Sequence, residues 1–247
     1  MNPSQPDEST APSGDHVSAI ILAGGMGVRM GGQPKALLQA HGQTLLERVV
    51  VQASDHASQV IVGLAQEVMS RGKAILGDRA ILARGGETRQ ATFQNTLALA
   101  TGEIIVIHDV ARPFASGVLW DAVIAGAREH GAAAPVVPIP VRDSIAMRDG
   151  GWLGAPVDRD RIVSIQTPYA FRRSILERAL AAASETGGTE TSVTTLVTRI
   201  GHRVQLVPGE DTNTKVTFEE DWSDAQRRIS ESQGAATNSA KSRTREL

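Results

Sequence analysis

The sequence predicts an α/β protein with a mostly parallel sheet flanked by helices, and three observations support this class. Short apolar runs alternate along the chain with segments of helical periodicity. The apolar runs lack polar alternation, which is typical of parallel strands buried on both faces. The chain has 247 residues, of which 41% are hydrophobic and 21% charged, as is ordinary for one large globular domain.

The expected elements fill residues 17–230, between two expected disordered tails at residues 1–16 and 231–247 that contain too little apolar surface to fold. Strands are expected at Val17–Leu22, Gln59–Gly63, Ala80–Arg84, Glu103–His108, Ala132–Val137 and Arg203–Val207. Helices are expected at Thr44–Ala53, Gln66–Gly72, Gln90–Ala100, Val118–His130, Arg172–Ser184, Val193–Ile200 and Phe218–Ile229.

Residues 140–165 interrupt this alternation. Prolines and glycines divide the stretch into short segments, and the pair Gly150-Gly151 lies between two of them. This pattern predicts strands joined by a hairpin turn. We expect the stretch to form an arm that protrudes from the main sheet.

Composition excludes several classes of function. The chain has no cysteine, so disulfides, thiolate catalysis and thiolate zinc sites are excluded. The net charge of -2 and the aromatic content of 3% argue against nucleic-acid binding. No apolar run approaches the roughly 20 residues that span a bilayer, and the N-terminal residues do not resemble a signal peptide. A cytoplasmic protein is expected.

The first apolar run ends in a glycine-rich loop, Leu22-Ala23-Gly24-Gly25, followed by Gly27, Arg29 and Lys35. Glycines allow the backbone to approach a ligand closely, and free N–H groups in such a loop can bind anions. Together with the two cations, the loop indicates a site for nucleotide phosphates. It is neither a P-loop nor a dinucleotide fingerprint. The alternative is an ordinary strand-to-helix turn with two surface cations.

A second cluster, Gly85-Gly86-Glu87-Thr88-Arg89 with Thr92, follows a later strand. Its donors and acceptor suit a base or a ribose. The alternative is a capped helix start, in which Thr88 or Glu87 binds first-turn amides.

The third cluster is His108-Asp109-Val110-Ala111-Arg112, directly after a buried strand. Ligands bind at the carboxyl ends of parallel strands, so this loop is expected to converge with the loops after Leu22 and Arg84. A carboxylate there is a natural ligand for Mg²⁺ beside phosphates. The alternative is that Asp109 caps the turn and pairs with Arg112. His108 is expected to be structural.

A fourth cluster includes arm residues Arg142, Asp143, Ser144, Asp158 and Arg159. Lys215 follows much later in Asn213-Thr214-Lys215-Val216-Thr217. Arg159 and Lys215 could hold a second phosphate. The alternative is a solvated charged pair on a hairpin.

Together these motifs resemble one family. The motifs, in chain order, are LAGGMGVRM, PK, GGETRQATF, HDVARPF, PVRDS, DRDRIVSIQTP and NTKVT. They resemble the 2-C-methyl-D-erythritol 4-phosphate cytidylyltransferases of isoprenoid precursor synthesis, over roughly Ala19 to Asp221. The ribitol 5-phosphate cytidylyltransferases are close relatives. The resemblance implies a Rossmann-like nucleotidyltransferase fold with an arm exchanged across a homodimer.

The resemblance also implies a role for each matching residue. Residues expected to bind CTP are Leu22, Ala23, Gly24, Gly25, Gly86, Glu87, Arg89, Thr92, Asp109 and Val110. Residues expected to act on the reacting phosphates are Arg29, Lys35, Lys215 and Arg159. Residues expected to bind the acceptor are Arg112 and, from the partner's arm, Ser144 and Arg159, and Asp109 is expected to hold Mg²⁺.

The implied reaction transfers CMP from CTP to 2-C-methyl-D-erythritol 4-phosphate and releases pyrophosphate. The acceptor phosphate is already ionised, with a second pKa of about 6, so no general base is needed. One alternative is the same chemistry on ribitol 5-phosphate or another polyol phosphate. A second alternative is an inactive nucleotide-binding homologue.

The sequence departs from the family pattern at several positions. The first loop reads LAGG where these enzymes usually carry PAAG. Ser144 stands in place of Thr, Ala146 in place of a frequent Lys, and Tyr169 in place of the second Gln of QTPQ. The TDDA-like stretch is here Thr191-Ser192-Val193-Thr194, without an acid. These changes lie mainly around the acceptor side and the arm.

Overall fold

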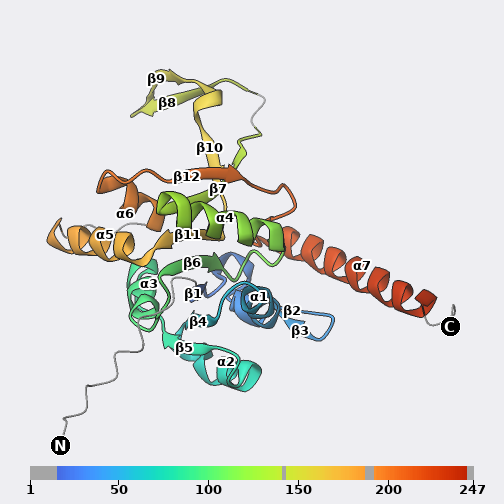
Figure 1. Cartoon of the computed structure of the whole chain (residues 1–247). Coiled ribbons are helices and arrows are strands. Elements are labelled where there is room, and N and C mark those ends of the chain that lie inside the picture. Colours follow the sequence, from blue (N-terminus) through green and yellow to red (C-terminus); the bar gives the residue numbers. More distant parts are fainter. Residues whose placement is uncertain (1–15, 141–142, 187–191, 244–247) are drawn as a thin grey trace, which may run out of the picture.

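The centre of the molecule is β1 (Val17–Ala23), an apolar strand in which all seven residues are buried. The computed structural model describes residues 16–140, 143–186 and 192–243. It contains an eight-stranded sheet in the order β10-β7-β11-β6-β1-β4-β5, with β12 paired to β7 (Figure 1). β1 runs parallel to β4 (Gln59–Leu64) and β6 (Ile104–Asp109), and β4 runs parallel to β5 (Ile81–Arg84). The prediction of a parallel sheet is confirmed in this half.

The other half of the sheet is mixed. Its strands are β7 (Ala132–Pro138), β10 (Val163–Ile165), β11 (Tyr169–Arg172) and β12 (Gln205–Pro208). β11 lies antiparallel between β6 and β7, β10 is also antiparallel to β7, and β12 is parallel to it. The sequence did not predict that the chain returns after the arm to insert β11 into the middle of the sheet.

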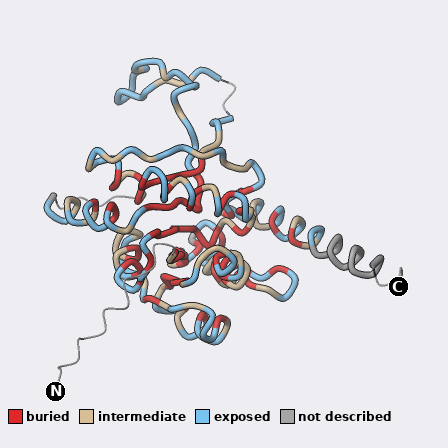
Figure 2. Tube along the Cα trace, in the orientation of Figure 1, coloured by how far each residue is buried: buried red, intermediate tan, exposed pale blue. Residues whose placement is uncertain are grey.

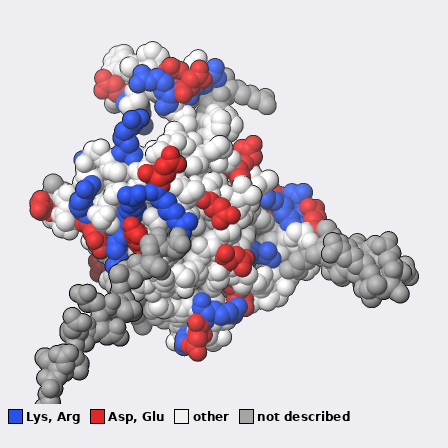
Figure 3. Space-filling view, in the orientation of Figure 1, with Lys and Arg blue, Asp and Glu red and all other residues white. Residues whose placement is uncertain are grey.

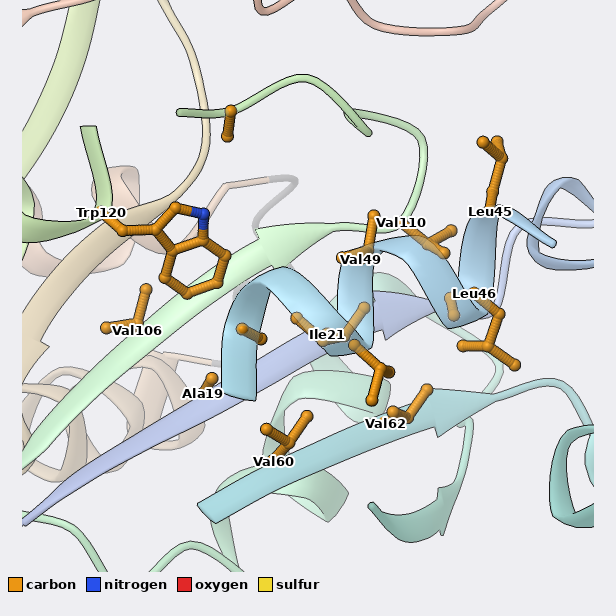
Figure 4. Close-up of a cluster of buried hydrophobic side chains, with 14 of the residues drawn as sticks. Ala19, Ile21, Leu45, Leu46, Val49, Val60, Val62, Val106, Val110 and Trp120 are labelled. Carbon is orange, nitrogen blue, oxygen red and sulfur yellow. The ribbon is translucent and has the colours of Figure 1, made fainter. Parts of the chain in front are cut away.

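Helices cover both faces of the sheet. Alternate residues of each strand point to opposite faces, and since the strands are apolar throughout, both faces need a covering layer. The helices are α1 (Leu45–Ser54), α2 (Met69–Leu76), α3 (Arg89–Leu97), α4 (Gly117–His130), α5 (Arg173–Thr186), α6 (Val193–Arg199) and α7 (Glu219–Arg243). One apolar cluster joins Ala19 and Ile21 to α1 and α4, and Figure 4 shows Val49 and Trp120 over this face. A second cluster joins Ile20 and Leu22 to α3, α5 and α6.

The arm is a separate two-stranded sheet of β8 (Ile145–Asp149) and β9 (Trp152–Val157), which pair antiparallel around Gly150-Gly151. The predicted hairpin is therefore confirmed, and Gly150 adopts a positive φ of 55° at the turn. The arm projects from the body (Figure 1), and it is mostly exposed while the buried residues gather in the sheet and its facing helices (Figure 2). A short helix, η4 (Arg159–Arg161), connects β9 to β10.

Three local features differ from the sequence prediction. Between the first loop and α1, where the sequence predicted no element, the chain forms η1 (Val28–Met30), η2 (Lys35–Leu37) and the hairpin β2 (Gln39–Ala40)–β3 (Gln43–Thr44). The expected short helix at Gln66–Gly72 is instead η3 (Gln66–Val68) followed by α2, which continues to Leu76.

The third difference concerns the chain's end. α7 continues to Arg243, where a disordered tail was expected from residue 231. Low apolar content predicts little burial, but a helix that has already begun extends readily through residues such as Ala, Gln and Lys. Residues 1–15 of the tail expected at residues 1–16, and the last residues, 244–247, lie outside the described residues. Among the helices that the structure describes, none is long and apolar enough to cross a membrane.

Candidate active site

Loops that follow β1, β5 and β6 meet at the carboxyl edge of the sheet, as predicted. A first cavity of about 320 Å³ there is lined by Leu22, Gly25, Gly27, Arg29, Lys35, Arg89, Asp109, Val110, Ala111, Lys215 and Thr217. A second cavity of about 260 Å³ is lined by Leu22, Gly24, Gly25, Gly86, Glu87, Thr88, Arg89 and Thr92. The two adjoin each other, because both include Leu22, Gly25 and Arg89. One polar crevice therefore unites most of the predicted site residues.

The first loop is held in a tight bend at Gly27. This residue has a φ of 64°, and a Cβ there would lie 1.9 Å from the carbonyl oxygen of Gln33, so only glycine fits. The Gly27 carbonyl accepts hydrogen bonds from the amides of Met30 and Gly32. The bend carries Arg29 to the rim of the first cavity, where its guanidinium lies 5.6 Å from the centre of the Phe218 ring.

Lys35 joins this loop to the segment before α7. Its Nζ donates to the carbonyl oxygens of Val216 at 2.8 Å and Thr217 at 3.4 Å. Burial, together with the neighbouring Lys215 and Arg29, lowers the pKa of Lys35. With Arg89, four cationic side chains thus line one cavity, which favours an anionic ligand.

Asp109 lies at the end of β6, in register with Leu22 of β1. Its Oδ1 accepts from Arg89 at 2.5 Å and its Oδ2 accepts from Lys215 at 2.7 Å. Burial alone would favour the neutral acid, but Arg89 and Lys215 hold the pKa of Asp109 well below its usual range. Burial likewise opposes the charge of Arg89, yet Asp109 raises its pKa overall. The carboxylate is ionised and shared between two cations from distant parts of the chain.

The backbone that presents Asp109 is fixed from below. The Asp109 amide donates to Thr167 Oγ1 at 3.1 Å, and Thr167 Oγ1 is 3.1 Å from His108 Nδ1. His108 Nε2 lies 2.9 Å from the Arg112 carbonyl, which can only accept, so this nitrogen carries the proton. Burial lowers the pKa of His108 to about 4. His108 is therefore a neutral structural residue, as expected.

The second cavity opens at the start of α3. Thr88 caps this helix, because its side chain accepts from the amide of Ala91. The alternative given for this cluster, a capped helix start, is thus correct for Thr88. Thr92 Oγ1 accepts from the amide of Gly86 at 3.0 Å, and a Cβ on Gly86 would come within 2.3 Å of the Ala91 Cβ. Glu87 and Arg89 remain in the cavity wall, where they can contact a base or a ribose.

A family model described as 2-C-methyl-D-erythritol 4-phosphate cytidylyltransferase matches residues 17–231. This chain belongs to that family. A relative with that name from Thermus thermophilus is 38% identical over 205 residues, which cover 83% of this chain and 93% of the relative. Another from Geobacillus kaustophilus is 35% identical over 212 residues, covering 82% of this chain and 92% of the relative.

Solved structures also support the assignment of this chain to the cytidylyltransferase family. The crystal structure of 2-C-methyl-D-erythritol 4-phosphate cytidylyltransferase from Thermus thermophilus matches with a TM-score of 0.71 and 35% identity, covering 86% of this chain and 98% of that one. The structure of 4-diphosphocytidyl-2C-methyl-D-erythritol synthase from Anaerococcus prevotii matches with a TM-score of 0.76 and 25% identity. The match covers 88% of this chain and 100% of that one.

Some predicted site residues of this family member lie apart from the crevice. Ala23 is buried within β1. Arg112 lies beneath the loop, where its Nη1 donates to the Asn213 carbonyl at 2.6 Å and so supports the segment that carries Lys215. Ser144 and Arg159 belong to the arm, and none of the described residues lining the two cavities comes from the arm. Arg142 lies outside the described residues.

Sequence reasoning did not single out Thr167 or Tyr169 as parts of the site. Thr167 holds the backbone of Asp109, and Tyr169 is buried on β11, where it pairs with Ile107 of β6. Thr167 was quoted only within the motif DRDRIVSIQTP, and Tyr169 only as a departure from the family pattern. Their position beside β6 was the missing information, because β11 was not predicted to insert there.

The residues present can accommodate a magnesium ion that arrives with phosphates. Asp109 is the only carboxylate among the described residues that line the first cavity. Over residues 16–140, 143–186 and 192–243, no group of three or more His, Asp or Glu side chains could hold a metal alone. Mg²⁺ is commonly held by one or two carboxylates together with substrate phosphates, and this chain offers that kind of site.

Proposed function

We propose that this protein transfers CMP from CTP to 2-C-methyl-D-erythritol 4-phosphate, forming 4-diphosphocytidyl-2-C-methyl-D-erythritol and pyrophosphate. The observation that carries the proposal is the family match over residues 17–231, together with the convergence of the matching motifs on one crevice at the edge of the sheet. A cytoplasmic location is part of this proposal, because the cytoplasm supplies CTP.

CTP would lie across both cavities. The amides of the loop at Gly24 and Gly25, with Arg29 and Lys35, suit the triphosphate, since glycine loops and cations bind anions. Glu87 and Thr92 in the second cavity suit the cytosine and the ribose. In this arrangement the α-phosphorus would lie near Asp109 and Lys215.

The reaction needs charge neutralisation more than proton transfer. A phosphate oxygen of the acceptor attacks the α-phosphorus, and the bond from that phosphorus to the leaving pyrophosphate oxygen breaks. The acceptor phosphate is already ionised, with a second pKa of about 6. Arg29, Lys35 and Lys215 would stabilise the oxygens that gain charge, which is the main source of catalysis in phosphoryl transfer.

A magnesium ion is part of this proposal. Asp109 would hold it together with phosphate oxygens, and the ion would neutralise charge on the triphosphate when bound. Because Arg89 and Lys215 occupy both oxygens of Asp109, these side chains must turn toward the phosphates when the ion and nucleotide arrive.

The acceptor side of the site is proposed to include the arm of a second copy of this chain. Ser144 and Arg159 are exposed on the arm, and Arg159 could bind the acceptor phosphate. The arm also exposes Trp152 and Leu153, at 81% and 87% of their surface, which favours burial against another protein surface. A homodimer would bury these apolar side chains and would also bring Arg159 of the partner subunit to the acceptor phosphate.

Duplex nucleic acid is not proposed as a partner. On the face drawn in Figure 3, basic and acidic side chains of the described residues are interspersed over the arm and the body. A duplex-binding surface would instead present a continuous basic patch.

An acceptor screen tests the proposal. Purified protein, CTP and Mg²⁺ are incubated with 2-C-methyl-D-erythritol 4-phosphate, with ribitol 5-phosphate or with no acceptor, and pyrophosphate release is measured. We expect release with the first acceptor at a rate far above the other two. Pyrophosphate release only with ribitol 5-phosphate would mean that ribitol 5-phosphate is the acceptor. CTP binding without pyrophosphate release would indicate an inactive homologue.

A further inference from the structure

We propose that Asn213 is a positioning residue for the transferase reaction: its buried side chain fixes the loop that carries Lys215, so that the Lys215 ammonium meets Asp109 at the wall of the crevice. This inference rests on the function proposed above. It extends the site to a residue that lines neither of the two cavities.

Lys215 lies on a stretch of chain that forms neither helix nor strand. Residues 209–218 connect β12 to α7, and Lys215 is in the part of this loop without regular secondary structure. Even so, Lys215 Nζ lies 2.7 Å from Asp109 Oδ2, while 42% of the lysine side chain is exposed. A lysine side chain is a flexible four-carbon stem, so its ammonium has a defined place only if the backbone beneath it is fixed. The loop therefore needs an anchor close to Lys215.

Asn213 is this anchor. Among residues 211–217, only Asn213 and Val216 are buried, and Asn213 is 0% exposed. Its Nδ2 donates to the carbonyl oxygen of Thr167 at 2.9 Å. A backbone carbonyl can only accept, so the nitrogen side of the Asn213 amide must face Thr167. The backbone carbonyl of Asn213 accepts from Arg112 Nη1 at 2.6 Å, so this residue joins the loop both to the segment before β11 and to the loop after β6.

Gln166, the residue before Thr167, holds the turn that leads to Asn213. Its Nε2 donates to the Glu210 carbonyl at 2.8 Å, and its Oε1 accepts from the Glu210 amide at 3.0 Å. The Glu210 carbonyl also accepts from the Asn213 amide at 3.0 Å, and Asn213 Nδ2 lies 3.4 Å from Gln166 Oε1. The backbone is thus fixed at both ends of this turn, which ends two residues before Lys215.

Thr167 connects the two partners of the ion pair. Its hydroxyl accepts from the Asp109 amide at 3.1 Å, and its carbonyl accepts from the Asn213 side chain. One residue beneath the crevice therefore sets how far the Lys215 backbone lies from Asp109. When nucleotide and magnesium arrive, Lys215 turns toward the phosphates from this fixed backbone. Pre-organised donors stabilise developing charge without rearrangement, and a displacement of about 1 Å can cost on the order of 100-fold in rate.

The test begins with Asn213→Ala, which leaves the Thr167 carbonyl without this donor. Complete loss of a stabilising donor costs on the order of 100-fold in kcat, and a displaced Lys215 keeps part of its effect. We therefore expect kcat for pyrophosphate release to fall about 10-fold. The KM for CTP should change by less than about 3-fold, because the other cations of the crevice still hold the triphosphate. Loss of a buried hydrogen bond should also lower Tm by several degrees, so the control must lose stability too.

Ser18→Ala is the matched control. Ser18 is also 0% exposed, and its Oγ accepts from the amides of Thr101 at 3.3 Å and Gly102 at 2.8 Å. It holds a loop at the opposite end of β1 from the crevice, because this strand begins at Val17 and reaches the crevice near Ala23. Ser18→Ala should lower Tm by a similar amount and leave kcat within about 2-fold of wild type. An equal fall of kcat in both variants would overturn the proposal, because lost stability would then explain it.

A double-mutant cycle decides whether Asn213 acts through Lys215. Lys215→Met removes the charge and keeps most of the side-chain length. In that background, Asn213→Ala should change kcat by less than about 2-fold, because the group that it positions is already gone. Effects that multiply would overturn the proposal, as would wild-type kcat in Asn213→Ala. If Asn213→Ala does not fold, Asn213→Ser, which also removes the amide, is measured in its place with the same expectations.

Hydrogen exchange tests the anchor without any substrate. Asn213→Ala should speed the exchange of the amides in residues 210–216 by about 10-fold or more, whereas Ser18→Ala should leave them at the wild-type rate. Faster exchange together with a failed acceptor screen would reject the proposed function and keep Asn213 as the anchor of Lys215. A successful acceptor screen with wild-type exchange in Asn213→Ala would keep the proposed function and reject this role.

Discussion

The crevice at the edge of the sheet and the β8–β9 arm differ in how far one chain completes them. In the crevice, residues from β1, α3, β6 and the segment before α7 meet, and Asp109 has a cation on each oxygen. In the arm, Met147, Trp152 and Leu153 are exposed at 61%, 81% and 87%. A monomer gains nothing from displaying such residues, since large exposed apolar patches mark interaction sites.

This contrast teaches that the two halves of the site follow different physical rules. The proposed nucleotide half is built where buried parallel strands end, and its lining residues all come from one chain. The proposed acceptor half would depend on a hairpin with little core of its own, whose residues would gain a fixed place against a partner. The predictions below test this division.

Lys35→Ala is expected to have the largest effect. Removing one stabilising donor costs on the order of 100-fold or more in turnover, and Lys35 also fastens the Val216–Thr217 backbone. Steady-state pyrophosphate release measures the change. Lys73→Ala, which removes an exposed lysine paired with Asp78, is the matched control and should keep wild-type turnover. Full activity in Lys35→Ala would show that the crevice is not the catalytic half.

The buried His108 makes the crevice half sensitive to acid. Its folded pKa of about 4 lies below the unfolded value of about 6.5, so the unfolded chain binds more protons between these pH values. Stability from this residue is present above pH 6.5 and is lost as pH falls toward 4, by about 3 kcal/mol in total.

Urea unfolding at pH 7, 5.5 and 4, without nucleotide or metal, measures this loss. His108→Gln should flatten the pH dependence, whereas His130→Gln, on the surface of α4, should leave it steep. An unchanged slope in His108→Gln would mean that the support of the Asp109 loop is looser than the structure indicates.

The sequence predicted which strand ends meet in the crevice better than it predicted the side-chain contacts between them. Apolar runs that end in glycine or acid mark strand ends, and parallel strands put these ends together, so the convergence at Leu22 and Asp109 followed from local pattern. The pairing of Arg89 with Asp109 did not follow, because Arg89 was assigned to the base or ribose. Nothing in the four residues of β11 indicates that they lie between β6 and β7. Thr167, just before β11, binds the Asp109 amide although the two residues are 58 positions apart in the sequence. Such contacts depend on tertiary placement, which a local pattern does not contain.

Replacing Trp152 and Leu153 together with Ser should disrupt the arm half. We expect a dimer to become a monomer in light scattering, and kcat/KM for the acceptor to fall about 10-fold because Arg159 of the partner subunit is lost, as expected for one charged hydrogen bond. CTP affinity should change by less than about 2-fold, since the crevice belongs to one chain. Val118→Ser, at a residue 78% exposed on α4, is the control and should alter neither property. A wild-type monomer with full activity would remove the case for a shared site.

The smallest effects come from two local changes of similar cost. Thr44 caps α1 through a reciprocal pair of bonds with Glu47, and Thr44→Ala should cost about 1 kcal/mol. Gly150→Ala should also cost about 1 kcal/mol or slightly more, because a side chain is unfavourable at its positive φ. The first change lies in the body and should lower the melting temperature by about 2–4 °C. The second lies in the arm and should leave that temperature unchanged while weakening the dimer. Equal shifts for both variants would mean that the arm unfolds together with the sheet, and the division between the two halves would then be one of function alone.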